Sequence, residues 1–180
     1  LPDSFSDCVG VLRVGGEITV DGASGVFAVS SASSTELVKL IQQAKGDERI
    51  KSILIEINSP GGSAVASKDI YDALRDSGKP SVAYLGEVAA SGGYYVASGT
   101  NWIVANPNTL TGSIGAKAEL LNYEALFQKL GLRDEAIKSG ELKDIGAGYR
   151  NMTDEERAIL QSIIDEAFEN FRDDVKIGRG

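Results

Sequence analysis

Apolar residues along this chain alternate between two spacings. Short runs of β-branched and aliphatic residues are typical of strands, and apolar residues three or four positions apart are typical of amphipathic helices. The pattern predicts strands at residues 9–14, 17–20, 53–57, 81–85, 102–105 and 114–119. It predicts helices at residues 35–44, 63–75, 90–98, 123–130 and 153–176. The strands at 53–57 and 102–105 are expected to be buried, and the small, polar segment 21–34 is expected to form a loop.

Residues at the predicted helix ends support these boundaries. Ser33 or Ser34 precedes the first helix and suits an N-cap, because a serine hydroxyl can accept a hydrogen bond from a first-turn amide. Thr153 and Glu156 have the spacing of a capping box at the start of the last helix. Gly131 is expected to end the helix before it.

The alternation of strands and helices also predicts the fold class. Successive strand–helix units form βαβ crossovers and a mostly parallel sheet, so an α/β fold is expected. We expect residues 1–8 to be an N-terminal tail and residues 9–180 to be a single domain. Ligands of such sheets bind beyond the carboxyl ends of the strands. Two glycine-containing segments, 58–62 and 89–93, follow predicted strands there.

Composition narrows the chemistry. The 180 residues include no histidine, which excludes Ser-His-Asp and Cys-His catalysis and histidine-ligated zinc within the chain. Cys8 is the single cysteine, so neither an intramolecular disulfide nor a cysteine-rich metal site can form. The net charge of −8 argues against nucleic acid as a partner. We predict neither a metal ion nor a cofactor.

No part of the sequence has the pattern of a membrane-spanning segment. It contains no apolar run of the roughly 18 residues that a spanning helix needs, and it opens with no signal peptide. Its first residue is Leu1 rather than methionine. We therefore expect a processed product or a fragment.

Ser91 is a candidate nucleophile. It lies between Ala90 and Gly92, two small residues at the start of a predicted helix, so its hydroxyl is accessible. The amide of Gly92 can donate to a developing oxyanion, and Gly61 or Gly62 can supply a second amide. A serine at this place is also a common helix N-cap, and the residues alone favour that interpretation.

Without histidine, a lysine is the simplest general base. A lysine accepts a proton only when it is neutral, which requires a desolvated position. Of the ten lysines, Lys117, Lys138 and Lys143 lie in or near glycine-bearing segments outside the predicted helices. A solvated surface lysine remains the alternative for each of them. Ser113 can hold a lysine side chain by a hydrogen bond, and a plain turn serine is its alternative.

Four short motifs carry a family resemblance. They are Asn-Ser-Pro-Gly-Gly at 58–62, Ala-Ser-Gly-Gly-Tyr-Tyr at 90–95, Leu-Thr-Gly-Ser-Ile-Gly at 110–115, and Lys-Ser-Gly at 138–140 with Lys-Asp-Ile at 143–145. With this order and spacing, the chain resembles the short, single-domain form of the signal peptide peptidase A family, also called protease IV. These are Ser-Lys serine peptidases with a ClpP/crotonase-like fold, a spiral of βαβ units.

The resemblance implies a role for each matching residue. Ser91 corresponds to the nucleophile, and Lys143, 52 residues later, corresponds to the general base. Ser113 corresponds to the serine that positions this lysine. Gly62 and Gly92 correspond to the two residues whose amides form the oxyanion hole.

The resemblance also implies substrates and partners. The substrates would be apolar peptides, such as cleaved signal peptides. Ring- or dome-shaped homo-oligomers would complete each site with the serine and the lysine of neighbouring protomers. The protein would be associated with a membrane through an N-terminal anchor absent from this chain. Its catalytic domain, soluble by itself, would lie outside the cytoplasm.

Three alternatives remain. An NfeD-type membrane protease shares the fold and a Ser-Lys dyad, but its base would be Lys129 or Lys138. An acyl-CoA enzyme of the crotonase type would use carboxylates, for which Glu87 and Glu119 are candidates. A non-catalytic scaffold would keep the oligomerising fold alone.

Overall fold

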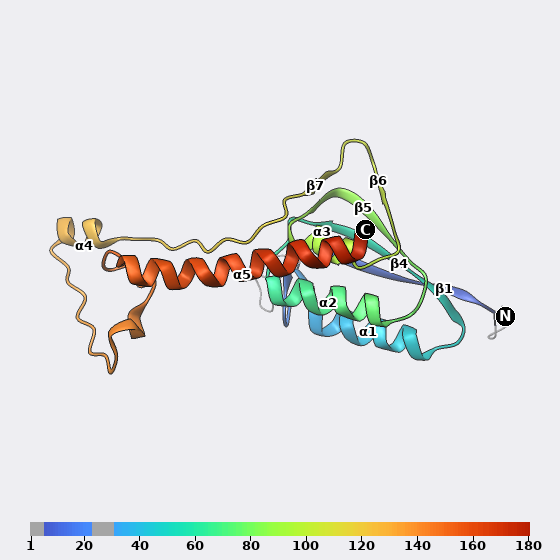
Figure 1. Cartoon of the computed structure of the whole chain (residues 1–180), viewed down its shortest axis with the longest axis horizontal. Helices are drawn as coiled ribbons and strands as arrows, with labels where there is room; N and C mark the ends of the chain where they lie inside the picture. The colour runs from blue at the N-terminus through green and yellow to red at the C-terminus, as the bar shows by residue number, and fades with distance from the viewer. Residues whose placement is uncertain (1–5, 23–30) are drawn as a thin grey trace. The chain divides into compact units, whose positions relative to one another are not determined.

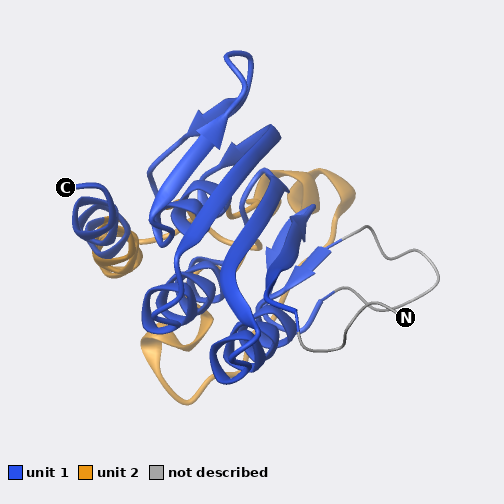
Figure 2. Ribbon diagram, turned by 90° about the vertical axis from the view of Figure 1, so that its right-hand side faces the viewer, with its two compact units in different colours: residues 1–115, 169–180 blue, residues 116–168 orange. Residues whose placement is uncertain are grey.

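The computed structural model describes residues 6–22 and 31–180. The chain forms two compact units (Figure 2). Unit 1 comprises Leu1–Gly115 and Glu169–Gly180, and unit 2 comprises Ala116–Phe168. Most of the predicted tail at residues 1–8 lies outside the described residues, and the first strand begins at Cys8.

Unit 1 is built on a parallel sheet. Its strands are β1 (Cys8–Gly15), β4 (Ile50–Ser59), β5 (Ser81–Ala90) and β6 (Trp102–Ala105), paired in that order, and β7 (Leu110–Gly112) also pairs with β5. The helices between them are α1 (Ser34–Gly46), α2 (Ala64–Asp76) and α3 (Gly92–Ser98), labelled in Figure 1. Every strand pair is parallel, which confirms the predicted α/β class and its βαβ crossovers.

The core of unit 1 lies between the sheet and its helices. Alternate residues of a strand point to one face, and Ile53, Ile55 and Ile57 of β4 are fully buried. Side chains spaced by four positions meet them from the helices, among them Leu37 and Ile41 of α1. Each such side chain stabilises the fold by roughly 1.5–3 kcal/mol through burial. The prediction of a buried strand at 53–57 is therefore confirmed.

Side-chain caps fix the helix starts. The hydroxyl of Ser33 accepts a 3.2 Å hydrogen bond from the amide of Glu36, so Ser33 and not Ser34 is the N-cap of α1. Ser63 caps α2 in the same way, accepting a 3.2 Å bond from Ala66. These caps satisfy amides that have no partner within the helix.

A second, smaller sheet differs from the prediction. β2 (Glu17–Thr19) pairs in parallel with β3 (Ser31–Ser33), which falls in the segment predicted to be a loop. Residues 23–30 of that segment lie outside the described residues. The small polar residues of β3 show no apolar alternation, so the sequence does not indicate a strand there. The segment is a strand because it pairs with β2.

Three other predictions were wrong in detail. β5 continues to Ala90, five residues beyond the predicted end, so the helix after it begins at Gly92. Residues 114–119 form no strand. β6 was expected to be buried, but Trp102 is 62% exposed and Val104 is 51% exposed. β6 pairs with β5 on one side, and of its residues Ile103 packs against the core while its neighbours point away.

Unit 2 contains the helix α4 (Glu124–Leu130), the 3₁₀ helix η1 (Glu141–Asp144) and the first part of α5 (Asp154–Arg179), which ends in unit 1. Gly131, with φ of 70°, ends α4 as predicted. The capping box is also confirmed, since Thr153 and Glu156 exchange hydrogen bonds of 2.9 and 3.2 Å. None of the helices at residues 6–22 and 31–180 is long and apolar enough to cross a membrane.

Candidate active site

Ser91 occupies a strained turn between β5 and α3. Its backbone has φ of 52° and ψ of −122°, a conformation that L-residues rarely adopt and that costs about 1–3 kcal/mol. Ser91 stands at the N-cap position, yet its hydroxyl forms no capping hydrogen bond. The side chain is half-buried. The interpretation of Ser91 as a helix cap is therefore not supported, and its hydroxyl is available for chemistry.

The backbone around Ser91 holds this conformation. The N–H of Ser91 donates to the carbonyl oxygen of Gly112 at 2.8 Å, and the Ser91 carbonyl accepts from the N–H of Tyr95 at 2.9 Å. Both polar groups of the main chain are thus satisfied by neighbouring elements. Backbone hydrogen bonds therefore hold the turn, without a capping bond from the Ser91 hydroxyl.

Two glycines after β4 pack directly against Ser91. A Cβ built on Gly61 would lie 2.7 Å from the nitrogen of Gly92 and 2.8 Å from Cβ of Ser91, distances too short for any side chain. Gly61 also has φ of 104°, which favours glycine. The next residue, Gly62, forms a bridge with Ile18 of β2. A Cβ on Gly62 would overlap the Ile18 backbone. Glycine is therefore required at both positions, because neighbouring backbone lies too close to each of them for a side chain.

The amides of Gly62 and Gly92 lie in the same corner. A Cβ built on Gly92 would be 3.3 Å from the nitrogen of Gly62. Gly92 begins α3, so its N–H has no acceptor within the helix. Within the described part of the chain, neither amide donates a hydrogen bond to another protein group. Two unpaired N–H groups beside a free serine hydroxyl are what an oxyanion hole requires.

Ser113 lies at the edge of the same region. β7 pairs with β5 so that Gly112 is opposite Ala90, which brings Ser113 next to the turn that carries Ser91. Ser113 is exposed and has φ of 54°. The structure thus collects Ser91, Ser113, Gly62 and Gly92 within unit 1. The strand responsible is β7, which the sequence pattern does not predict.

The predicted base lies elsewhere in the chain. Lys143 is an exposed residue of η1 in unit 2, so the structure does not bring it together with Ser91 within one unit. Its ammonium group forms no ion pair or hydrogen bond with the described residues. Lys138 differs, because its Nζ donates to Oδ1 of Asp144 and to the Glu141 carbonyl, both at 2.7 Å. Lys129 is an exposed residue in the last turn of α4.

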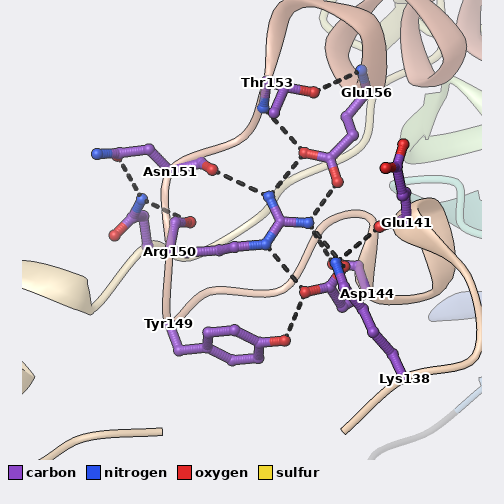
Figure 3. A network of polar contacts seen from close by, with 9 residues as sticks. Lys138, Glu141, Asp144, Tyr149, Arg150, Asn151, Thr153 and Glu156 are labelled. Atoms are coloured by element: carbon purple, nitrogen blue, oxygen red, sulfur yellow. Dashed lines mark hydrogen bonds and ion pairs between the residues drawn. The ribbon is translucent and has the colours of Figure 1, made fainter. Parts of the chain in front are cut away.

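A network of charged groups surrounds η1 (Figure 3). Arg150 contacts two carboxylates, Asp144 and Glu156, and holds the pKa of both below the ordinary range. Hydrogen bonds from Arg150 are the largest cause for each, and the pKa of Glu156 falls to about 2. The sequence pattern does not indicate Arg150. The capping box marked Glu156, but no spacing rule indicates the arginine that pairs with it.

The described residues include no group of three or more His, Cys, Asp or Glu side chains placed to hold a metal ion. The groups collected in unit 1 are two backbone amides and two serine hydroxyls. Such a set can support nucleophilic acyl transfer, in which a hydroxyl attacks a carbonyl and amides stabilise the oxyanion.

Comparisons with known proteins agree with this chemistry. The sequence matches the family model for peptidase family S49 over residues 73–180 and that for Clp protease over residues 25–110. The second match, with the parallel sheet, confirms the predicted ClpP-like fold class.

Individual relatives are longer than this chain. A provisionally named signal peptide peptidase SppA of Enterococcus faecium is 34% identical over 171 residues, which are 93% of this chain and 50% of that protein. Protease 4 of Haemophilus influenzae is 32% identical over 174 residues, 95% of this chain and 28% of that protein. A mutant of the membrane-bound stomatin-specific protease 1510-N, in complex with a substrate peptide, has a TM-score of 0.48 and 27% identity, covering 66% of this chain and 48% of that one. The chain therefore spans half or less of the length of these relatives.

Proposed function

The chain belongs to peptidase family S49, and from this premise we propose that it hydrolyses peptide bonds with Ser91 as nucleophile and Lys143 as general base. The observation that carries the proposal is the backbone conformation of Ser91 together with the groups around its hydroxyl. Ser91 stands on a strained turn, and its hydroxyl forms no capping hydrogen bond. The nearby amides of Gly62 and Gly92 have no acceptor among the described residues. Strain of this kind is retained where the surrounding structure imposes it, and it concentrates at functional sites.

The proposed reaction has two stages. Neutral Lys143 takes the proton of the Ser91 hydroxyl as its oxygen attacks the carbonyl carbon of the peptide. The N–H groups of Gly62 and Gly92 stabilise the resulting oxyanion. Protonated Lys143 then gives its proton to the leaving amine, the C–N bond breaks, and an acyl-enzyme remains. Water then gives a proton to Lys143 as its oxygen attacks the acyl carbon; the ester C–O bond breaks, and Lys143 returns the proton to the Ser91 oxygen as the acid product leaves. Ser113 orients Lys143 throughout.

The contacts of the two lysines favour Lys143 over Lys138 as the base. Lys138 Nζ already donates hydrogen bonds to the Asp144 carboxylate and to the Glu141 carbonyl, both at 2.7 Å, so it is engaged by groups of its own segment. The ammonium of Lys143 has no such partner among the described residues. This argues for the Ser91–Lys143 dyad and against the NfeD-type alternative.

We further propose that two copies of the chain complete each site. Ser91 lies in unit 1 and Lys143 in unit 2, an arrangement that suits exchange of unit 2 between neighbouring protomers of a homo-oligomer. The proposed substrates are apolar peptides such as cleaved signal peptides, after the name of the Enterococcus relative. We also propose that the catalytic domain acts at a membrane and outside the cytoplasm, where such peptides would be met.

Hydrolysis of a fluorogenic apolar peptide near pH 8 tests the dyad. We expect Ser91→Ala and Lys143→Ala to abolish turnover, Lys138→Ala to keep a measurable part of it, and Lys129→Ala to keep all of it. Loss in Lys138→Ala with full activity in Lys143→Ala would assign the base to Lys138. No turnover by wild type over a panel of peptides would contradict the peptidase proposal.

Mixing inactive variants tests the shared site. When Ser91→Ala and Lys143→Ala protomers assemble at random, about a quarter of the sites in a ring combine an intact serine with an intact lysine. We therefore expect the mixture, after dissociation and reassembly, to regain roughly a quarter of wild-type activity. No recovery would mean that serine and lysine come from the same protomer.

A further inference from the structure

Lys143 lies on a segment with little rigidity of its own. η1 is a single 3₁₀ turn of four residues, none of them buried, and the preceding residues 132–138 form no regular structure. Short 3₁₀ turns have weaker hydrogen-bond geometry than α-helices. A general base must nevertheless be held within a narrow range of positions, because small displacements cost large factors in rate. Contacts from outside η1 must therefore hold it.

The residue after Lys143 provides the contact. The carboxylate of Asp144 accepts hydrogen bonds from Arg150 Nε at 2.9 Å, Arg150 Nη2 at 2.8 Å, Lys138 Nζ at 2.7 Å and the Tyr149 hydroxyl at 2.7 Å. The Asp144 side chain is 13% exposed. Both oxygens are used fully, so the carboxylate has no freedom to move without breaking several charge-assisted bonds.

Arg150 connects this carboxylate to a rigid element. The other edge of its guanidinium contacts Glu156, with Nη1 at 2.8 Å from Oε2 and Nη2 bonded to Oε1. The Glu156 side chain is 2% exposed and also accepts the Thr153 amide at 2.9 Å, as part of the cap of α5. Arg150 therefore joins η1 to the first turn of a 26-residue helix.

Arginine is required for this geometry. A guanidinium is planar and can present two N–H pairs to two carboxylates at once, whereas the ammonium of lysine is a single point donor. Figure 3 shows the guanidinium between the two carboxylates. Both carboxylates are ionised at neutral pH, and the hydrogen bonds of Arg150 lower the pKa of each further below its ordinary value.

We propose that Arg150 is the positioning residue for the general base, because its double fork fixes Asp144 to Glu156 and thereby fixes the adjacent Lys143. This inference rests on the proposed role of Lys143. Arg150 itself touches no reacting atom, so its loss should reduce the rate of the chemical step and leave substrate binding unchanged.

Arg150→Lys tests the proposal, since it keeps the positive charge and removes the fork. We expect kcat on the fluorogenic peptide to fall about 10–100-fold with KM within about twofold of wild type. The acid limb of the kcat–pH profile should also move, because that limb reports the protonation of the general base in the enzyme–substrate complex. Arg133→Lys is the matched control. Arg133 is exposed and forms no ion pair with the described residues, so its variant should match wild type.

The outcomes separate this inference from the proposed function. Unchanged kcat and an unmoved acid limb in folded Arg150→Lys, with Lys143→Ala inactive, would overturn the inference alone. A fall in kcat with no movement of the limb would also overturn it, since that result indicates general loss of structure. Full activity in Lys143→Ala would instead defeat the proposed function. If melting shows that Arg150→Lys does not fold, Asp144→Asn decides by the same two measurements.

Discussion

The amide of Ser91 donates a 2.8 Å hydrogen bond to the carbonyl oxygen of Gly112, and this bond ties the turn of the proposed nucleophile to the strand before Ser113. In the described part of the chain, Ser91 and Ser113 are the two non-glycine residues with positive φ, at 52° and 54°. Each conformation costs free energy that glycine would not. Serine at both places is consistent with a need for the hydroxyl groups.

Two substitutions of Ser113 distinguish the effect of its backbone conformation from the effect of its hydroxyl. Ser113→Gly suits the positive φ and removes the hydroxyl, whereas Ser113→Ala removes the hydroxyl and keeps the strain. If the hydroxyl positions Lys143, both variants should lose about 10–100-fold in kcat, the range of one hydrogen bond to a charged group. Steady-state kinetics on the peptide substrate measures this. Wild-type kcat in Ser113→Gly would show that the hydroxyl has no such role.

Gly61→Ala should displace the amides of Gly62 and Gly92, which we propose as the oxyanion hole. The added methyl group would lie 2.7 Å from the nitrogen of Gly92, so the local backbone must shift. Loss of a well-placed oxyanion donor lowers kcat about 10²–10³-fold.

Gly78→Ala is the control for Gly61→Ala. Gly78 also has positive φ, 67°, but a Cβ there would have no neighbour within 4 Å. Gly78→Ala should therefore lower the free energy of unfolding by about 1–2 kcal/mol and leave kcat unchanged. Equal kcat values for the two variants would contradict the assignment of the Gly62 and Gly92 amides as the oxyanion hole.

Asp174 should stabilise the end of α5 against α2 and α3. Its carboxylate accepts from the Tyr95 hydroxyl and pairs with Lys68 at 3.1 Å, and Tyr95 stacks on Phe171 at 4.3 Å between ring centroids. We expect Asp174→Ala to lower the free energy of unfolding by roughly 1–3 kcal/mol, measured by denaturant titration.

Asp173→Ala provides the comparison for Asp174→Ala. The neighbouring side chain is 54% exposed, and its partners Arg172 and Lys176 are solvated, so little stability should be lost. A loss as large as that of Asp174→Ala would show that Asp174 has no special role.

The charged network predicts acid sensitivity. The folded-state pKa of Glu156 is lowered from 4.5 to about 2 by Arg150 and the Thr153 amide. A group whose pKa is lower in the folded state stabilises the fold above its unfolded pKa, and this contribution is lost as pH falls from about 4.5 to about 2. Calorimetric melting midpoints across this window should fall less steeply for Glu156→Gln than for wild type. Glu155→Gln, at an exposed neighbour, should parallel wild type. Parallel profiles for all three proteins would contradict this prediction.

The sequence by itself was sufficient for features that depend on neighbouring residues. The capping box of Thr153 and Glu156 and the stop at Gly131 are local, and both were confirmed. The cap of the first helix was predicted at Ser33 or Ser34, and the structure has it at Ser33. The motif at 90–95 pointed to Ser91 as the nucleophile through a family resemblance. The residues alone favoured a helix cap, because composition does not reveal a backbone angle or an unused hydroxyl.

The tertiary structure decided what depends on residues far apart in the chain. β3 is a strand because β2 pairs with it, and β6 is exposed because it pairs with β5 alone among the strands. The approach of Gly61 to Gly92 joins the ends of two strands, and the double fork of Arg150 joins a 3₁₀ turn to a helix. Strand pairing, close backbone approach and side-chain ion pairing are relations between separate segments, and no local pattern specifies which segments will meet.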